Sequence, residues 1–373
     1  MKGLLYKVFL AFAVLSALTF TACKHRPLVD MSNAHYVRVY IDEHLKNVTE
    51  GFYDEELERP IYQVPTVMRV MLCDPASGRM VAERYLQSKA RDGRGYYLDG
   101  YIIAAAGDYD LMIYNFGTET TQLKDENNYR NISAYTNPIS PMLYTKLPSS
   151  KAEFAPEDIR YDPDHLFVHK QERVHIPLKG HVDTLLTEQG DYFTAHSVVK
   201  SYYLQIRVRG VEHLRSAVSL LSGMSGSSIL CEGRMNPNDP AVIYFEMKSG
   251  HRSKLPLRDP SKDPGAVTDP NGDVSAPTTE VATLYSTFNT FGKIDGVESI
   301  YKVTFEFVKT DGSSQTETLV ITPLFYTPDA IDHQWILIDH EIEITPPEDP
   351  QIEGGGFTPG VEDWQDEQTD III

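Results

Sequence analysis

Short runs in which apolar and polar residues alternate recur along most of the chain. In 202–208, Tyr202, Leu204, Ile206 and Val208 alternate with other residues. This period of two is typical of a β-strand with one buried face. Similar runs, bounded by Gly, Asp, Asn or Pro, predict strands at 35–42, 66–73, 80–86, 108–116, 172–178, 200–209, 241–248, 281–291, 300–309, 316–322 and 334–344.

One segment has the spacing of an amphipathic helix. In Val211–Leu221, apolar residues at 211, 214, 218 and 221 fall on one helical face, and Gly223 follows as a C-cap. The pair Asp311-Gly312 lies between two strand-like runs and predicts a hairpin. Because closely spaced strands without alternating helices favour antiparallel sandwiches, we expect an all-β protein with one short helix in its second half.

The breaks in the pattern indicate two domains, which is also the number that 373 residues suggest. The stretch 136–165 is rich in proline and acids and is predicted to be a junction. We therefore expect one β-sandwich over 34–150 and a second over 151–348. A Pro, Asp and Gly-rich loop at 256–280 interrupts the second, and residues 349–373 form a flexible tail or a final strand.

The composition argues against one class of partner and against a disulfide-rich fold. The formal net charge is −19 and no strong basic cluster follows the first residues, which argues against nucleic acid as a partner. Three cysteines cannot form a disulfide framework. A disulfide between Cys73 and Cys231 is one arrangement, but two isolated, mostly buried thiols are favoured.

The first 22 residues have the features of a secretory signal peptide. Lys2 and Lys7 precede an apolar stretch from Val8 to Phe20, which is too short for a comfortable membrane span. The stretch resembles a bacterial lipobox, which would make Cys23 the acylated first residue of the mature chain, with 23–33 as a lipidated tether. An ordinary signal peptide beside an incidental cysteine is the alternative.

The sequence indicates no enzyme. It contains no P-loop, dinucleotide fingerprint or HExxH motif, so we assign no catalytic residue, no metal and no cofactor apart from acyl chains on Cys23. The loop 269–280 has acidic residues at EF-hand spacing, but Val274 stands where glycine is required. Whether this loop binds calcium stays open.

Several short motifs together resemble the Bacteroidales-type fimbrial lipoproteins, which include the FimB-like anchors. They are Cys23–Leu28 after the signal, the strand Tyr36–Tyr40, the strand Gly107–Phe116, and Leu221–Met224. The resemblance implies two tandem transthyretin-like, Greek-key β-sandwiches, tethered by lipid to the outer membrane. It also implies a role in cell adhesion, as a structural, anchoring or assembly component of fimbriae whose subunits join by β-strand addition. The side of the membrane that the body faces stays open.

The C-terminal tail is the candidate segment for such an exchange. Gly354–Gly356 can uncouple it from the second sandwich, and it carries the apolar residues Val361, Trp364, Ile371, Ile372 and Ile373 among acids. Either this piece folds back as a last strand, or it adds to a neighbouring fimbrial subunit.

Two further interpretations remain. Asp183-Thr184-Leu185 resembles the O-glycosylation signal of this bacterial group, which makes Thr184 a candidate site. A surface glycan-binding lipoprotein of a nutrient-uptake system is the alternative function, and it would expose two or three coplanar aromatic rings.

Overall fold

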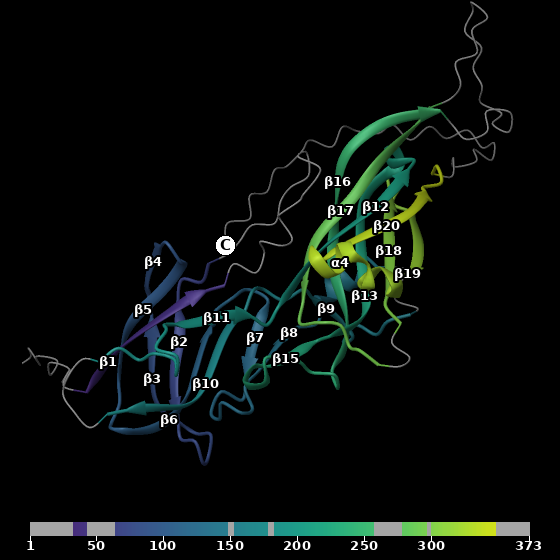
Figure 1. Cartoon of the computed structure of the whole chain (residues 1–373). Helices are drawn as coiled ribbons and strands as arrows, with labels where there is room; N and C mark the ends of the chain where they lie inside the picture. Colours follow the sequence, from purple (N-terminus) through teal and green to yellow (C-terminus); the bar gives the residue numbers. More distant parts are fainter. Residues whose placement is uncertain are drawn as a thin grey trace, which may run out of the picture.

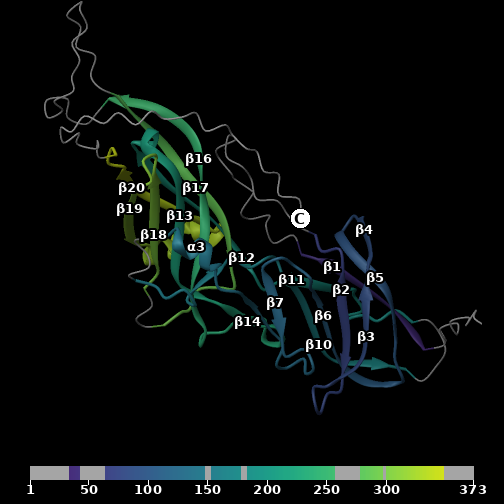
Figure 2. The same cartoon turned by 180° about the vertical axis from the view of Figure 1, so that it is seen from behind.

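The computed structural model describes residues 33–42, 64–147, 153–177, 183–256, 278–296 and 300–347. These residues form an elongated all-β molecule with one sandwich at each end and a small sheet between them (Figures 1 and 2). The all-β prediction with two tandem sandwiches is confirmed. Among these residues the α-helices are α3 (Pro141–Thr145) and α4 (Pro328–Asp332), and both are short. No described helix has the length and apolar character of a membrane span.

The first sandwich is a continuous path of eight strands folded over on itself. Its apolar core lies between the layers and includes the fully buried side chains of Val37, Leu98, Leu111 and Phe193. In sheet order the strands are β3 (Met80–Leu86), β2 (Met68–Cys73), β6 (Gly107–Asn115), β10 (Phe167–Ile176), β11 (Phe193–Ser197), β1 (Ala34–Ile41), β5 (Gly95–Ile103) and β4 (Ser88–Asp92).

The boundary predicted between residues 150 and 151 does not match this pairing. Strand β10 pairs with β6, and β11 pairs with both β10 and β1, so residues 167–197 complete the first sandwich. The alternation in this region predicts a strand, but it carries no information about which sheet the strand joins, because the partners lie far away in sequence.

The second sandwich is built around the long strand β16 (Pro240–Pro256). Its first half pairs with β13 (Leu214–Ser225) and its second half with β17 (Thr278–Thr290), so one strand belongs to both layers. The remaining strands are β9 (Ile159–Tyr161), β12 (Lys200–Arg209), β18 (Lys302–Lys309), β19 (Ser314–Val320) and β20 (Trp335–Glu343). Strands β18 and β19 form the hairpin that Asp311-Gly312 predicts.

The predicted helix over Val211–Leu221 is wrong. A 3₁₀ turn (Val211–His213) leads directly into strand β13. Ala217 and Leu221 face the main core, whereas Leu220 packs under residues of the 139–159 connection. Because both faces of β13 are covered, its apolar residues do not alternate cleanly and imitate helical spacing.

Gly223 marks an irregularity within β13 and does not cap a helix. The register with β16 shifts between Leu221 and Met224, and Gly223 has φ +86°. A Cβ atom at this position would stand 2.5 Å from the ring of Tyr301. Glycine therefore satisfies both a left-handed backbone and a close side-chain approach.

A third, small sheet connects the two sandwiches. Its order is β15 (Arg234–Met235), β14 (Ser227–Ile229), β8 (Ser133–Thr136) and β7 (Thr121–Lys124), and β14 pairs with β8 across the junction. Beneath it lies a mixed core to which Met112 and Tyr114 of β6 and Phe291 of the second sandwich all contribute. The outer face of β6 is therefore buried as deeply as its inner face.

The two described cysteines are free thiols, as predicted. Cys73 is buried in the mixed core, and burial raises the pKa of its thiol to about 12. Cys231 packs against the same core, and burial raises the pKa of its thiol as well. Both thiols therefore stay protonated at neutral pH, as expected of structural cysteines.

Candidate functional site

Strand β1 is the first described element after the N-terminal segment, and both of its edges are occupied. It pairs antiparallel with β5 from Ala34 to Tyr40 and parallel with β11 from Val39 to Ile41. Where β11 does not reach, the backbone of Tyr36 donates to Asp183 O (2.9 Å) and accepts from Leu185 N (2.8 Å). The chain therefore enters the fold through a strand that is hydrogen-bonded on both sides.

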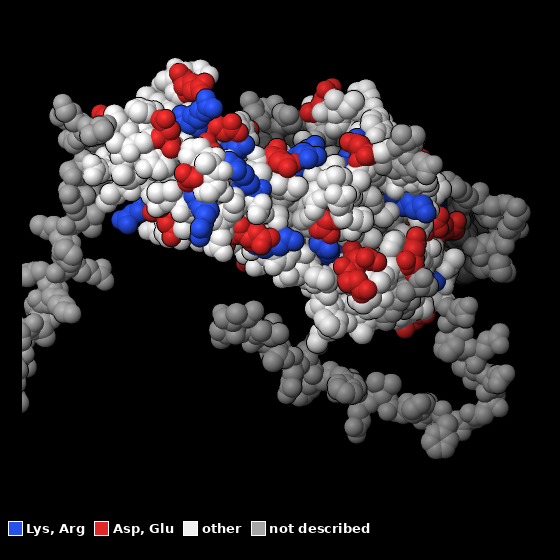
Figure 3. All heavy atoms as spheres, turned by 90° about the horizontal axis from the view of Figure 1, so that it is seen from below, with Lys and Arg blue, Asp and Glu red and all other residues white. Residues whose placement is uncertain are grey.

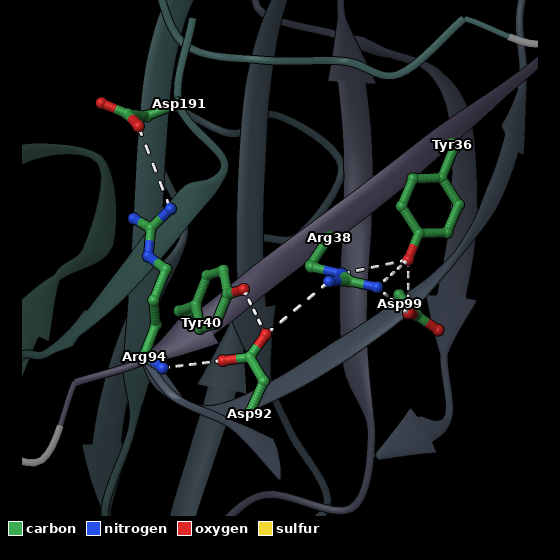
Figure 4. Close-up of polar contacts among 7 residues, drawn as sticks. All are labelled: Tyr36, Arg38, Tyr40, Asp92, Arg94, Asp99 and Asp191. Atoms are coloured by element: carbon green, nitrogen blue, oxygen red, sulfur yellow. Dashed lines mark hydrogen bonds and ion pairs between the residues drawn. The ribbon is translucent and has the colours of Figure 1, made fainter. Parts of the chain in front are cut away.

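The sequence of β1 accounts for this central place. Val37 and Val39 are fully buried and Ile41 is 3% exposed, so the alternate apolar residues face the core. Tyr36, Arg38 and Tyr40 point to the opposite face, where polar side chains from neighbouring elements meet them (Figure 4). This alternation is the ordinary consequence of strand geometry.

Arg38 lies at the centre of the polar face. Its Nη2 donates to the hydroxyl of Tyr36 (2.8 Å) and to Asp99 of β5 (3.2 Å), and its Nη1 lies 3.8 Å from Asp92 of β4. The guanidinium also stacks over the ring of Tyr97, 4.0 Å from its centroid. One side chain of β1 is thus tied to both β5 and β4.

Two tyrosines complete the arrangement. The hydroxyl of Tyr36 donates to Asp99, and that of Tyr40 donates to Asp92 (2.7 Å). The backbone N–H of Arg94 donates to the other oxygen of Asp92 (2.8 Å). We call the side chains of Tyr36, Arg38, Tyr40, Asp92 and Asp99 the β1 clamp.

The electrostatics of the clamp match these hydrogen bonds. Burial, followed by the hydrogen bond to Asp99, raises the pKa of Tyr36 to about 12. The backbone N–H of Arg94, followed by the Tyr40 hydroxyl, lowers the pKa of Asp92 below its usual value. At neutral pH the tyrosines are therefore neutral donors and Asp92 is a charged acceptor, which is the state that holds β1 in place.

The geometry of the clamp differs from that of a flat sugar platform. The rings of Tyr36 and Tyr101 meet at 63°, and those of Tyr40 and Tyr97 at 58°. Each of the five clamp side chains has a hydrogen-bond partner inside the group. The clamp therefore fixes a strand, and it lacks the coplanar rings that the glycan-binding alternative requires.

Of the site residues predicted from the sequence, Thr184 lies among the described residues. Thr184 is exposed and lies in a β-bridge beside Tyr36, while the next residue, Leu185, is 4% exposed and anchors the segment in the core. Cys23, the calcium-loop residues 269–277 and the tail residues Val361, Trp364 and Ile371–Ile373 lie outside the described residues. Within the described ranges, no group of three or more His, Cys, Asp or Glu side chains is placed to hold a metal ion.

The sequence analysis missed the clamp. A signal was present, because Tyr36, Arg38 and Tyr40 alternate with the apolar residues at 37, 39 and 41 of a predicted strand. Their aspartate partners could not be identified, because β4 and β5 were not predicted.

Together, the fold and the clamp define a class: two-sandwich proteins in which the first strand is locked into the centre of a sheet. The chain belongs to the family described as "Domain of unknown function (DUF5119)", whose model matches residues 22–246. It is also 24% identical, over 363 residues, to the "Putative fimbrium anchoring subunit Fim4B" of Bacteroides ovatus, covering 94% of this chain and 93% of that protein. The resemblance to fimbrial proteins is thereby confirmed.

One solved structure supports the fold. A crystal structure of a "putative adhesin" from Bacteroides ovatus has a TM-score of 0.53 at 20% identity, over 88% of this chain and 99% of that one. The fimbrial anchor protein Mfa2 from Porphyromonas gingivalis is more distant, with a TM-score of 0.40 at 11% identity over 81% of this chain and 88% of Mfa2.

Proposed function

We propose that this protein is a structural subunit that anchors a fimbrium in the outer membrane through acyl chains on Cys23. The observation that carries the proposal is the position of β1. The predicted tether 23–33 leads directly into a strand that is paired on both edges and held by the clamp. A force on the tether would therefore act at once on the backbone hydrogen bonds along both edges of β1, and an anchoring subunit needs this resistance.

The relatives support the same assignment. The match to a protein named as a fimbrium anchoring subunit extends over nearly the full length of both chains. We infer a non-enzymatic role at the cell envelope, with other fimbrial subunits as protein partners. Across the face shown in Figure 3, basic and acidic side chains lie intermixed, without the continuous basic surface that nucleic acid needs.

We also propose roles for the two ends of the chain and for one modified residue. Cys23 would carry the lipid, and the tail residues Val361, Trp364 and Ile371–Ile373 would add as a strand to a neighbouring fimbrial subunit. Thr184 would accept an O-linked glycan, and its exposure next to a buried leucine supports this assignment.

Membrane fractionation of the native host tests the anchor. Cys23→Ala should release the protein from the membrane fraction or stall its processing, and fimbriae should then detach from the cells. Cys231→Ala is the matched control, because that thiol lies in the mixed core and should leave fractionation unchanged. A Cys23→Ala protein that is processed normally, stays in membranes and retains fimbriae would refute the lipid anchor.

A deletion tests the tail. Removal of residues 357–373 should preserve the melting temperature and abolish co-purification with fimbriae. A large loss of stability would instead support a tail that folds back onto the second sandwich. A truncated protein that is fully stable and fully assembled would contradict both roles.

A further inference from the structure

The chain enters the first sandwich at the end that lies away from the second. Strands β1 and β11 run parallel, and after Ser197 the chain leaves β11 for β12 of the second sandwich. The last residues of β1 therefore point toward the second sandwich, and its first residue, Ala34, lies at the opposite end of the molecule (Figure 1). The predicted tether joins the fold at this outer end.

A turn at this end is joined directly to the tether. The turn 104–106 connects the end of β5, which pairs with the first residue of β1, to the start of β6. The backbone N–H of Ala104 donates to the carbonyl of Asn33 (3.2 Å). The hydroxyl of Tyr109 donates to the carbonyl of Ala105 (3.1 Å), which helps to fix the shape of the turn. The turn is therefore a fixed neighbour of the last tether residue.

The surface around this turn is apolar and open to solvent. The sequence Gly100–Gly107 contains no charged residue. Ile103 is 39% exposed, and Ala105 and Ala106 are exposed as well. Pro177, which follows the ladder partner of Gly107, is also exposed. We call the side chains of Ile103, Ala105, Ala106 and Pro177 the apolar tip.

Polar side chains begin directly behind the apolar tip. Tyr101 is 44% exposed, and its ring packs against that of Tyr36 with 5.5 Å between centroids. One residue into β6, the carboxylate of Asp108 contacts Nδ1 of His175 (2.7 Å), and both side chains are exposed. Tyrosine is enriched where a membrane meets water, and charged groups remain in the water. Apolar, aromatic and charged groups therefore follow one another in the order that a membrane interface favours.

The tether is short enough to keep the apolar tip beside a bilayer. Residues 24–33 separate Cys23 from β1, and ten extended residues span at most about 35 Å. A surface held within such a distance has a high effective concentration, so that even a weak apolar contact forms. For a chain acylated at Cys23, the bilayer is the surface that stays within this distance.

We propose that the apolar tip lies in the interface of the outer membrane and fixes the orientation of the first sandwich on it. The acyl chains supply the affinity, and the tip supplies the direction, so that the second sandwich points away from the bilayer. This inference rests on the proposed lipid anchor at Cys23 and adds a second membrane contact, made by folded residues.

Fluorescence quenching in vesicles tests the contact. The full chain with its acyl chains is reconstituted into phosphatidylcholine vesicles that contain nitroxide-labelled lipid. In a Cys231→Ala background, Ala105→Cys carries an environment-sensitive label, and Cys73 stays unlabelled because it is buried. Val320→Cys, at a position of the second sandwich that is 60% exposed, is the control. The label at 105 should shift to shorter wavelength and lose most of its emission, and the label at 320 should keep both.

A charge placed on the apolar tip should reverse this result. Ile103→Asp should restore most of the emission of the label at 105, because a carboxylate is costly to bury in the interface. Val320→Asp makes the same charge change on the second sandwich and should leave the quenching unchanged. Ala106→Asp, at an exposed position of the turn, should act like Ile103→Asp. Circular dichroism melts establish that each variant is folded.

Three outcomes would overturn the assignment. An unquenched label at 105 would mean that the tip stands off the bilayer, and equal quenching at 105 and 320 would mean that the body has no fixed orientation. Quenching that survives both aspartate variants would mean that the tip side chains do not make the contact.

Flotation of the same vesicles separates failure of the tip from failure of the proposed function. A chain that does not float with the vesicles refutes the lipid anchor and the tip contact together. A chain that floats while its label at 105 stays unquenched refutes the tip contact alone and leaves the anchor intact.

Discussion

Strand β1 and the two end strands, β3 and β4, belong to the same sandwich but meet their surroundings in opposite ways. β1 is paired along both edges, and its outward side chains form hydrogen bonds within the clamp. Strands β3 and β4 each pair with one neighbouring strand among the described residues, and most of their side chains are exposed, although Leu86 is fully buried.

The difference separates two tasks that an assembling subunit must perform. The place where the tether enters must not exchange, because a strand that leaves the sheet would release the protein. The place where a partner adds must present unpaired backbone groups without exposing the core. We expect substitutions in β1 to lower stability and substitutions at the exposed positions of β3 or β4 to leave it nearly unchanged.

The largest effect should come from the same substitution made in both strands. Val39→Asp places a carboxylate at a fully buried position and should destabilise the first sandwich by at least about 4 kcal/mol. Val81→Asp, at a position that is 56% exposed, should change the free energy of unfolding by less than about 0.5 kcal/mol. Scanning calorimetry measures both. Similar losses of unfolding free energy in the two variants would contradict the difference between β1 and β3.

An intermediate effect should follow removal of the arginine at the centre of the clamp. Arg38→Met leaves Asp99 without its ion pair and Tyr36 without a donor, and should cost about 2 kcal/mol because the site is only partly exposed. Arg84→Met, on the edge, is the matched control and should be nearly neutral in chemical denaturation. If Arg38→Met were equally neutral, the clamp would not stabilise β1.

The smallest effect concerns alkaline pH. Tyr36 has a folded pKa of about 12 against about 10 when unfolded, so its neutral form adds stability below pH 10 that is lost between about pH 10 and 12. Tyr36→Phe lacks this titration and should lose less stability than the wild type over that interval. Parallel curves for Tyr36→Phe and the wild type would contradict the assignment.

Local periodicity predicted most strands of this protein but not their partners. Alternation located β1, β2, β3 and β6 within about two residues. It missed β5, because its polar and aromatic residues face a partly covered surface, and it misassigned β13, which is buried on both faces. The boundary after residue 150 was wrong for a related reason, since strand pairing over long sequence separations leaves no local signal.

The candidate site was harder to predict than the fold. The Tyr-Arg-Tyr alternation of β1 is visible in the sequence, but Asp92 and Asp99 become its partners only through the pairing of β1 with β5 and of β5 with β4. An antiparallel register relates residues about sixty positions apart, and composition or spacing alone does not reveal it.

The small sheet between the sandwiches has a consequence for the order of folding. The outer face of β6 packs in the mixed core, to which Leu230 and Phe291 contribute although the rest of its sandwich ends at Ser197. A chain made from its N-terminus therefore emerges with this core incomplete until most of the second sandwich has been synthesised. A chain truncated before Phe291 would leave the core around Met112 and Tyr114 without one of its aromatic rings.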